Sequence, residues 1–184
     1  VLIRGSGLLD DIQLLPDMPS TVVYEDAEDG LINGWTIYDG IPAGATINNN
    51  YDSSRGSQVL QLSGDGISNG YRLRQSDGSN WGSTGLNWIQ WSQNFSENHR
   101  IYIGVETDLG WRYLVYLPID GDSAQSSNLR QIYHRIGVNF QNGSWQTITR
   151  NLEIDLKALE PNNNIISVEQ LLVRGSGLID DIQL

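Results

Sequence analysis

Carboxylates crowd one stretch near the start of this 184-residue chain. The segment VVYEDAEDGLINGW, residues 22–35, carries Glu25, Asp26, Glu28 and Asp29 within five positions. Like charges at this spacing repel one another, and a divalent cation would relieve the repulsion. Ca²⁺ binds about six to eight oxygen atoms from carboxylates and carbonyl groups. The spacing therefore favours a calcium site; the alternative is that the acids face water and protect an edge strand from aggregation.

A second carboxylate pair, Asp180 and Asp181, lies in the closing segment GLIDDIQL. Adjacent strand residues point to opposite faces, so at most one of the two can point inward, where it needs a partner. The first and last strands of a sandwich commonly lie side by side, which would bring both acidic segments together. We therefore expect Ca²⁺ as a cofactor, with ligands drawn from Glu25, Asp26, Glu28, Asp180 and Asp181.

The beginning of the chain repeats its end. VLIRGSGLLDDIQL at 1–14 and LLVRGSGLIDDIQL at 171–184 differ only by exchanges among Val, Leu and Ile. A long constant offset of this kind indicates a tandem repeat. We expect residues 1–14 to be the tail of a preceding copy, or strands donated to a neighbour. Residues 15–21, with two prolines, then form a linker, and 22–184 form one domain.

Short alternating apolar runs separated by Gly, Asn, Asp and Ser dominate the domain. This pattern predicts an all-β protein, a β-sandwich or jelly roll. One segment, residues 151–161, instead places leucines at helical spacing, with Asn151 as a candidate N-cap and a proline at its end. We expect one short helix there, and strands at 57–64, 69–75, 86–93, 100–106, 110–118, 144–151 and 166–174.

A family resemblance rests on the two bracketing segments. AEDGLINGW and GLIDDIQL are similar to the opening and closing signatures of calcium-binding, jelly-roll carbohydrate-binding modules with a galactose-binding-domain-like fold. Glu28, Gly34 and Trp35 match the first half, and the Asp180–Asp181 pair matches the second. The resemblance implies a buried Ca²⁺ held by Glu28, one Asp of the pair and backbone carbonyls. The alignment also allows Tyr24–Glu25 as the aromatic–Glu pair of the signature, so the ligand assignment stays open.

The whole unit also resembles a repeat of large secreted bacterial proteins. The blocks that carry this second resemblance are NGYRL at 69–73, the segment 145–152 and RGSGLIDDI at 174–182. The resemblance implies an extracellular or cell-surface location in a bacterium.

Sugar binding needs exposed aromatic faces together with polar side chains for the hydroxyl groups. Alternation on 100–106 places Ile101 and Ile103 inward and Tyr102 outward, and on 69–75 it leaves the arginines outward. Trp111 and Tyr113 are further aromatic candidates, while most tryptophans, Trp35 above all, are expected in the core. The expected ligand-binding residues are Arg72, Arg74, Trp88, Gln90, Tyr102, Arg112 and Tyr116.

Composition excludes several classes of function. The net charge of −11 argues against nucleic acid as a partner, and against a polyanionic glycan unless the arginines cluster locally. The absence of cysteine excludes thiol chemistry and disulfides. No apolar run approaches the ~18 residues of a membrane span. Neither His99 nor His134 lies in a nucleophile motif or a metal pair, so we expect no enzyme.

Two functions remain. The first is a non-catalytic, calcium-stabilised module that binds polysaccharide or cell-surface glycan within a tandem array. The second is a structural repeat of an extracellular adhesin, stalk or filament. In that case neighbouring copies of the domain are its partners, joined by donation of strands 1–14.

Overall fold

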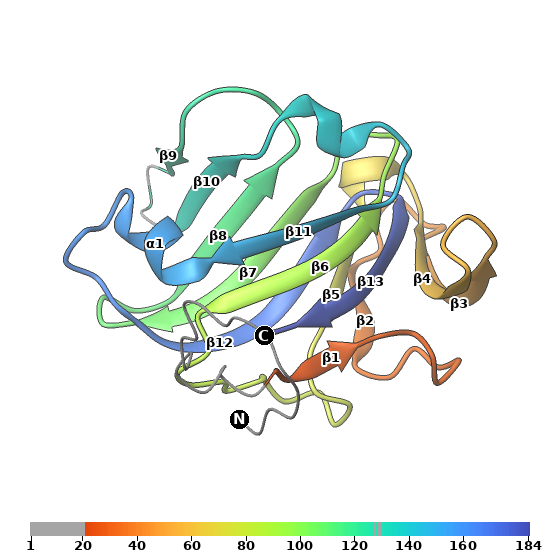
Figure 1. Ribbon diagram of the computed structural model, residues 1–184, viewed down its shortest axis with the longest axis horizontal. Helices are drawn as coiled ribbons and strands as arrows, with labels where there is room; N and C mark the ends of the chain where they lie inside the picture. The colour runs from red at the N-terminus through yellow and green to blue at the C-terminus, as the bar shows by residue number, and fades with distance from the viewer. Residues whose placement is uncertain (1–20, 127, 129) are drawn as a thin grey trace, which may run out of the picture.

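Two β-sheets packed face to face form the domain, with one short α-helix at the side (Figure 1). The computed structural model describes residues 21–126, 128 and 130–184. This architecture confirms the β-sandwich, or jelly roll, with one short helix. The tail 1–14 and the linker up to residue 20 lie outside the described residues, so their assignment stays a prediction.

One sheet has six strands. Its order is β11-β6-β13-β4-β3, and β1 pairs with β13 beside β4. All of these neighbours run antiparallel. The bounds are β1 (Val23–Glu25), β3 (Thr46–Asp52), β4 (Ser57–Ser63), β6 (Trp88–Asn94), β11 (Gln146–Asn151) and β13 (Gly177–Gln183).

The other sheet has seven strands in the order β2-β5-β12-β7-β8-β10-β9. Its pairs are antiparallel except for β8 and β10, which run parallel. The bounds are β2 (Trp35–Asp39), β5 (Gly70–Leu73), β7 (Arg100–Thr107), β8 (Arg112–Leu117), β9 (Ala124–Gln125), β10 (Gln131–Arg135) and β12 (Ile165–Arg174). The helices are α1 (Leu152–Lys157) and the 3₁₀ turns η1 (Gly66–Ser68) and η2 (Val138–Gln141).

A single large core fills the space between the sheets. Its largest fully buried side chains include Trp91, Tyr71, Tyr116 and Phe95. Trp35 is also buried in this cluster, as expected. At roughly 25 cal/mol per Å² of apolar surface, side chains of this size supply most of the free energy that holds the two sheets together.

Alternation located seven strands well but left others unassigned, among them β2, β9 and β10 of the seven-stranded sheet. All seven expected strands exist with bounds shifted by at most a few residues. Strand β3, with the sequence TINNNYD, was not expected, because asparagine is uncommon in strands and three occur here. It is an edge strand that pairs with β4 along its whole length. The helix is shorter than expected, but Asn151 does cap it: its Oδ1 accepts a hydrogen bond from the Ile154 N–H at 3.0 Å.

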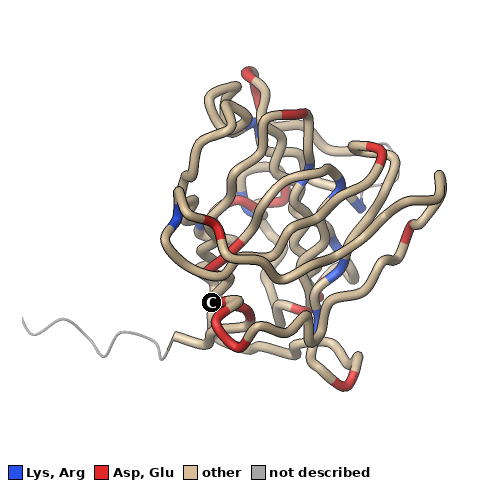
Figure 2. The backbone as a smooth tube through the Cα atoms, turned by 90° about the vertical axis from the view of Figure 1, so that its right-hand side faces the viewer, with Lys and Arg blue, Asp and Glu red and all other residues tan. Residues whose placement is uncertain are grey.

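The opening and closing segments meet at one edge, as expected. Val23 of β1 lies opposite Gln183 of β13, and Glu25 lies opposite Ile182. Backbone hydrogen bonds between residues 22 and 184 extend the pairing, with N···O distances of 2.8 and 2.9 Å. Figure 2 shows an acidic loop directly beside the C-terminal end of the chain.

Candidate functional site

The acidic loop after β1 is organised around one buried carboxylate. Only 8% of Glu25 is exposed. One of its oxygens accepts from the Ala27 N–H at 2.8 Å, and the other accepts from the Trp35 indole N–H at 2.8 Å. Burial raises the pKa of Glu25 to about 7, although these two hydrogen bonds act in the opposite direction. Asp26 and Glu28 are exposed in the same loop.

The Asp180–Asp181 pair is held by an arginine. The Arg55 Nε lies 2.9 Å from the Asp180 carboxylate, and its Nη2 contacts Asp181. Asp180 is buried, as expected for the inward member of the pair, and Arg55 is the partner that it needs. Asp181 takes a positive φ of 50° at a bulge, which brings both carboxylates to one guanidinium. The guanidinium also stacks over Trp145 at 4.5 Å.

The five expected metal ligands are therefore not gathered into one site. Among the described residues, no group of three or more His, Asp or Glu side chains is placed to hold a metal ion. Glu25 faces the same side as its register partner Ile182, into the core, whereas the Asp181 side chain is 45% exposed beside Arg55. The cation that neutralises the aspartate pair is a guanidinium.

Oxygen atoms do converge at one point of the acidic loop. The Asn49 Nδ2 donates to the carbonyl oxygens of Ala27 and Leu31 at 2.7 and 2.9 Å. The Oδ1 of the same amide is buried without a hydrogen-bond partner. Rotating the amide by 180° would direct this oxygen at the two carbonyls, an arrangement that requires a cation between them. In this structure both Glu25 oxygens accept from N–H groups and the Asn49 amide donates to both carbonyls, so a calcium ion at this point would have to replace these hydrogen bonds.

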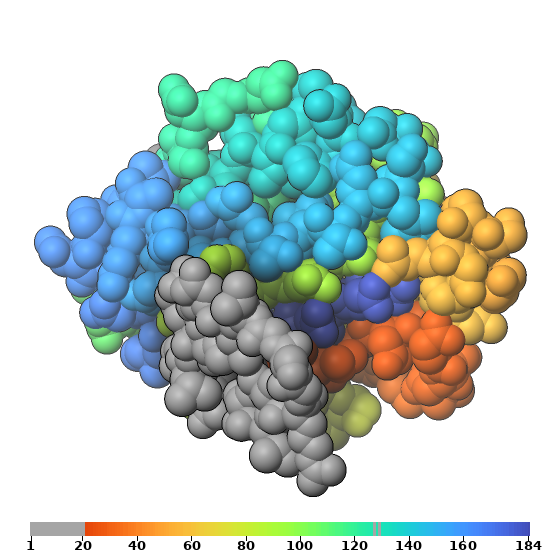
Figure 3. All heavy atoms as spheres, in the orientation of Figure 1, coloured from red at the N-terminus to blue at the C-terminus, as the bar shows by residue number. Residues whose placement is uncertain are grey.

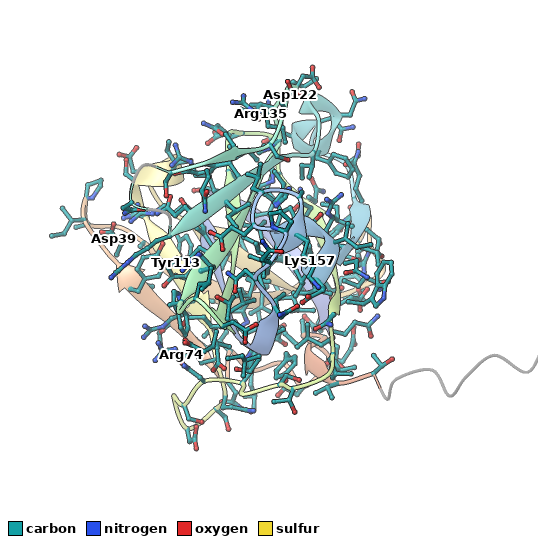
Figure 4. The ribbon with its side chains drawn as sticks, turned by 90° about the vertical axis from the view of Figure 1, so that its left-hand side faces the viewer. Asp39, Arg74, Tyr113, Asp122, Arg135 and Lys157 are labelled. Carbon is teal, nitrogen blue, oxygen red and sulfur yellow. The ribbon has the colours of Figure 1, made fainter. Side chains whose placement is uncertain are left out.

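The most conspicuous candidate surface lies elsewhere, on the outer face of the seven-stranded sheet. A second apolar cluster covers this face, centred on Tyr102 of β7, Val115 of β8 and Leu172 of β12. Tyr113 and Tyr133 pack against it. The three central side chains are buried, and Tyr113 and Tyr133 are the half-buried rings of this aromatic surface. Figure 4 shows the labelled Tyr113 and Arg74 on this side.

A cavity of about 550 Å³ opens at one end of the aromatic surface. Arg74 just after β5, Gln170 of β12 and Tyr113 of β8 line it. The Arg74 Nε donates to the Gln170 Oε1 at 2.8 Å, and the Gln170 Nε2 donates to the Tyr113 hydroxyl at 3.3 Å. Trp111 lies over Gly104, where a Cβ atom would come within 2.8 Å of the indole ring. The glycine thus makes room for a flat aromatic wall.

A second cavity, of about 210 Å³, continues the surface toward β2. Tyr113 lines both cavities. Arg174 lies 5.5 Å over the Tyr38 ring and pairs with Asp39 at 2.5 Å. Tyr102 and Tyr113 meet edge to face, with their ring centroids 6.1 Å apart. We call the two cavities and the aromatic cluster between them the groove.

Three expected ligand-binding residues belong to this face. Tyr102 lines the smaller cavity and Arg74 the larger one. Arg72 of β5 lies opposite Leu172 of β12, which lines the smaller cavity, although Arg72 itself lines neither cavity. Trp111 and Tyr113, the further aromatic candidates, lie here as well.

Trp88 and Gln90 do not belong to the groove, contrary to the expectation. Both lie on β6, which is part of the six-stranded sheet. Trp88 is 53% exposed on the opposite side of the molecule, where β6 surfaces between β11 and β13 (Figure 3). The expectation failed because the connection 95–99 carries the chain from one sheet to the other, a crossing that alternation within a strand does not reveal.

Tyr116 and Arg112 also correct the expectation. Tyr116 is fully buried in the main core, and its hydroxyl donates to Asp155 at 2.7 Å. The Arg112 Nε is bound to Glu160 at 2.9 Å, so its guanidinium is already paired, although the residue contributes to the rim of the larger cavity. Strand β8 buries both faces, under the core on one side and under the aromatic cluster on the other, so its sequence shows no clear alternation.

Several groove residues were not predicted from the sequence: Tyr38, Gln131, Gln170 and Arg174. Strand β12 is apolar on both faces for the same reason as β8, which concealed Gln170. Alternation along one strand does not reveal which residues lie beside Tyr102 on the neighbouring strands. A groove is formed by several strands at once, so these residues could not be predicted.

The two histidines are packing residues. His99 is buried, stacks on Phe95 with centroids 4.1 Å apart, and contacts the Gln93 amide. Burial lowers its pKa to about 4. Burial likewise lowers the pKa of His134, whose Nδ1 contacts the Ser123 hydroxyl.

Comparisons with known proteins bear on the fold alone. No protein-family model and no curated protein matches the sequence. Among solved structures, a family 11 carbohydrate-binding module from Clostridium thermocellum, in complex with a β-1,3-1,4-mixed-linked tetrasaccharide, aligns with a TM-score of 0.46 and 14% identity. The alignment covers 89% of this chain and 94% of that module.

Other similar structures come from both binding modules and enzymes. A tandem of two family 22 modules from Paenibacillus barcinonensis Xyn10C aligns with a TM-score of 0.43 and 14% identity, covering 86% of this chain and 47% of that one. The enzymatically active domain of tailspike protein 4 from bacteriophage CBA120 aligns with a TM-score of 0.46 and 11% identity, covering 88% and 20%. No helix in the described part of the chain is long and apolar enough to cross a membrane.

Proposed function

We propose that the domain is a non-catalytic module that binds a polysaccharide in the groove of its seven-stranded sheet. The single observation that carries this proposal is the groove itself, in which Tyr38, Tyr102, Trp111 and Tyr113 alternate with arginine and glutamine side chains. Aromatic rings stack on the apolar face of a pyranose, and the interleaved donors and acceptors bind its hydroxyl groups.

The shape of the groove suits an extended chain. Its two cavities share Tyr113, so one ligand can occupy both and cross several strands. The floor residues are held by contacts with one another, as in the Arg74–Gln170–Tyr113 series, and little side-chain entropy remains to be lost on binding. The histidines are buried in packing contacts, which supports binding without catalysis.

Binding measurements with two matched aromatic variants test the proposal. The wild-type domain is titrated calorimetrically with a panel of soluble neutral and acidic polysaccharides. Tyr113→Ala removes a ring shared by both cavities and should weaken binding roughly fivefold or more. Trp88→Ala removes an exposed ring from the opposite sheet and should leave affinity unchanged. Equal affinities of the two variants, or no binding to any member of the panel, would count against the proposal.

Calcium belongs to the proposal as a structural ion beside the acidic loop. The Glu25 carboxylate, the carbonyls of Ala27 and Leu31 and the Asn49 side chain would hold it, and the ion would supply charge compensation for the buried Glu25. Asp26 and Glu28, exposed nearby, are candidates for outer contacts. The expected result is a melting temperature that falls when EDTA is added to the calcium-loaded protein; an unchanged melt removes calcium from the account.

The tandem array and the extracellular location remain part of the proposal. The copy of residues 1–14 at 171–184 forms the end of β12 and all of β13, which lie inside the two sheets, not at their edges. Such a segment has little to stabilise it apart from the rest of its own domain, which supports the view that it closes a preceding copy. In the alternative, an adhesin, stalk or filament built by strand donation, residues 1–14 add to a sheet edge of a neighbouring copy.

Tandem expression distinguishes these alternatives. Residues 1–184 preceded by one further copy should melt as two folded units and remain monomeric at high concentration. Chains that polymerise through residues 1–14, and lose this ability when those residues are deleted, would favour strand donation.

A further inference from the structure

Arginines gather on the face that carries the groove. The chain has 22 acidic residues against 11 basic ones, yet Arg74, Arg112, Arg130 and Arg174 all line the two cavities. Among the described residues, no Asp or Glu lines either cavity. Arg112 and Arg174 are paired with Glu160 and Asp39, whereas Arg74 is held by neutral oxygen atoms and keeps its positive charge uncompensated at the larger cavity.

A further arginine on this face, Arg72, has no carboxylate partner among the described residues. Its Nε is buried without a hydrogen bond in the described part of the chain. Burial lowers its pKa, and the neighbouring Arg74 adds to the effect by repulsion. A buried donor left unsatisfied costs about 1–3 kcal/mol. Arg74 is bound only to neutral oxygens, those of Gln170 and Gly78.

A second unsatisfied donor faces the same region. The indole N–H of Trp111, at the wall of the larger cavity, is also buried without a partner. The two donors lie on the same sheet, Arg72 on β5 and Trp111 just before β8, with β12 and β7 between them. Carboxylate and sulfate oxygens accept strongly and in pairs from an arginine fork.

We propose that the ligand of the groove is an acidic polysaccharide, whose carboxylate or sulfate groups pair with Arg72 and Arg74 while its rings stack on the tyrosines. This inference rests on the proposed function and narrows its substrate class. A neutral polysaccharide would leave the guanidinium of Arg72 without an anion. The paired arginines, Arg112 with Glu160 and Arg174 with Asp39, shape the walls of the cavities.

Two ligands that differ only in charge provide the first test. Polygalacturonate and its fully methyl-esterified form have the same backbone, so any difference in affinity reports the carboxylates. The wild-type domain should bind polygalacturonate, or alginate, at least tenfold more tightly than the esterified polymer. Raising NaCl from about 20 mM to about 500 mM should weaken binding to the acidic polymer and leave binding to neutral polymers unchanged. A sulfated galactan distinguishes sulfate from carboxylate as the charged group.

Two charge variants provide the second test. Arg72→Gln removes an unpaired guanidinium, so the domain should fold with unchanged or increased stability and lose roughly tenfold in affinity for the acidic polymer. Lys157→Gln removes the same charge from α1, where Lys157 pairs with Glu153, and should not change affinity (Figure 4). Circular dichroism and melting of both variants establish that they fold.

The outcomes separate the inference from the function on which it rests. Equal affinity for the neutral and acidic polymers, with Arg72→Gln silent, overturns the acidic ligand and leaves glycan binding intact. No binding to any polymer overturns both. Preference for the sulfated galactan alone retains the anionic class and assigns sulfate as the charged group.

Discussion

Arg55 pairs with the carboxylates of both Asp180 and Asp181, whose negative charges would otherwise lie side by side without a cation. Asp180 is nearly fully buried, so its charge depends on the guanidinium 2.9 Å away. We expect Arg55→Met to lower the free energy of unfolding by about 3 kcal/mol in urea titrations, because removing one partner of a buried ion pair leaves the other uncompensated. Arg55→Met/Asp180→Asn should recover part of the loss. A single variant as stable as the wild type would show that the pair is not charged.

The same variant separates the two cations that can act at this edge. If the aspartate pair binds Ca²⁺ once Arg55 is gone, added calcium should restore the stability of Arg55→Met. The geometry predicts no such rescue, since calcium is assigned to the Glu25 loop and not to the aspartates.

Glu25 predicts a pH dependence with a definite sign. Its pKa is raised to about 7, so the folded state favours the protonated form; this contribution is complete below its ordinary pKa and is lost as the pH rises through 7. In EDTA, the free energy of unfolding should fall by about 1 kcal/mol between pH 6.5 and 8. The depressed pKa of His99, about 4, acts in the opposite direction, because stability is gained as the pH rises from about 4 through the ordinary histidine pKa; the Glu25 contribution is therefore measured as the difference between the wild type and Glu25→Gln.

Calcium modifies that profile if it binds beside Glu25. At pH 8, saturating Ca²⁺ should remove the decline, because the ion compensates the ionised carboxylate. A difference between the wild type and Glu25→Gln that is flat in EDTA above pH 6.5 would contradict the raised pKa, and an unchanged decline of that difference with Ca²⁺ would contradict the assignment of the ion to Glu25.

At the scale of the elements, Gly104 on β7 controls how closely Trp111 approaches the sheet. A Cβ at this position would meet the indole at 2.8 Å and the Gln170 side chain at 2.9 Å. We expect Gly104→Ala to displace both side chains and to weaken polysaccharide binding several-fold, with a loss of stability of about 1–3 kcal/mol, since the obstructing atoms belong to a rigid indole ring and to the Cγ of Gln170, close to the backbone. An unchanged affinity would show that Trp111 takes no part in binding.

The cap of α1 offers a control outside the groove. Asn151→Ala removes the hydrogen bond to the Ile154 N–H and should lower the free energy of unfolding by about 1 kcal/mol. Its affinity for polysaccharide should equal that of the wild type. A loss of affinity would show that the groove depends on this end of the sandwich.

The strands also show which parts of the fold could be predicted from sequence alternation. Alternation identifies which face of a strand is buried, and it correctly directed Tyr102 outward and Ile103 inward. It does not say which sheet a strand joins, so Trp88 was assigned to the wrong side. It also fails where both faces of a strand are covered, as on β8, because Val115 and Tyr116 are then both fully buried.

At the scale of the whole molecule, the two ends of the unit meet through β1 and β13, and the ligand groove lies on the other sheet. Pairing of the ends could be anticipated because the first and last strands of a sandwich commonly lie side by side, whereas the groove could not, since its residues come from several strands of the sheet. The arginines showed the same limit: composition gives a net negative charge, and only the fold shows that four arginines line the two cavities.

Tryptophan indole signals provide the most direct measurement of where a polysaccharide binds. In a ¹⁵N-labelled domain titrated with the tightest-binding polymer of the panel, cut to short oligosaccharides, Trp111 and Trp88 report opposite sheets. The account predicts that the Trp111 Nε1–H resonance shifts and saturates with the binding curve while that of Trp88 stays in place. A shift of Trp88 with Trp111 unmoved would place the ligand on the six-stranded sheet and contradict the account.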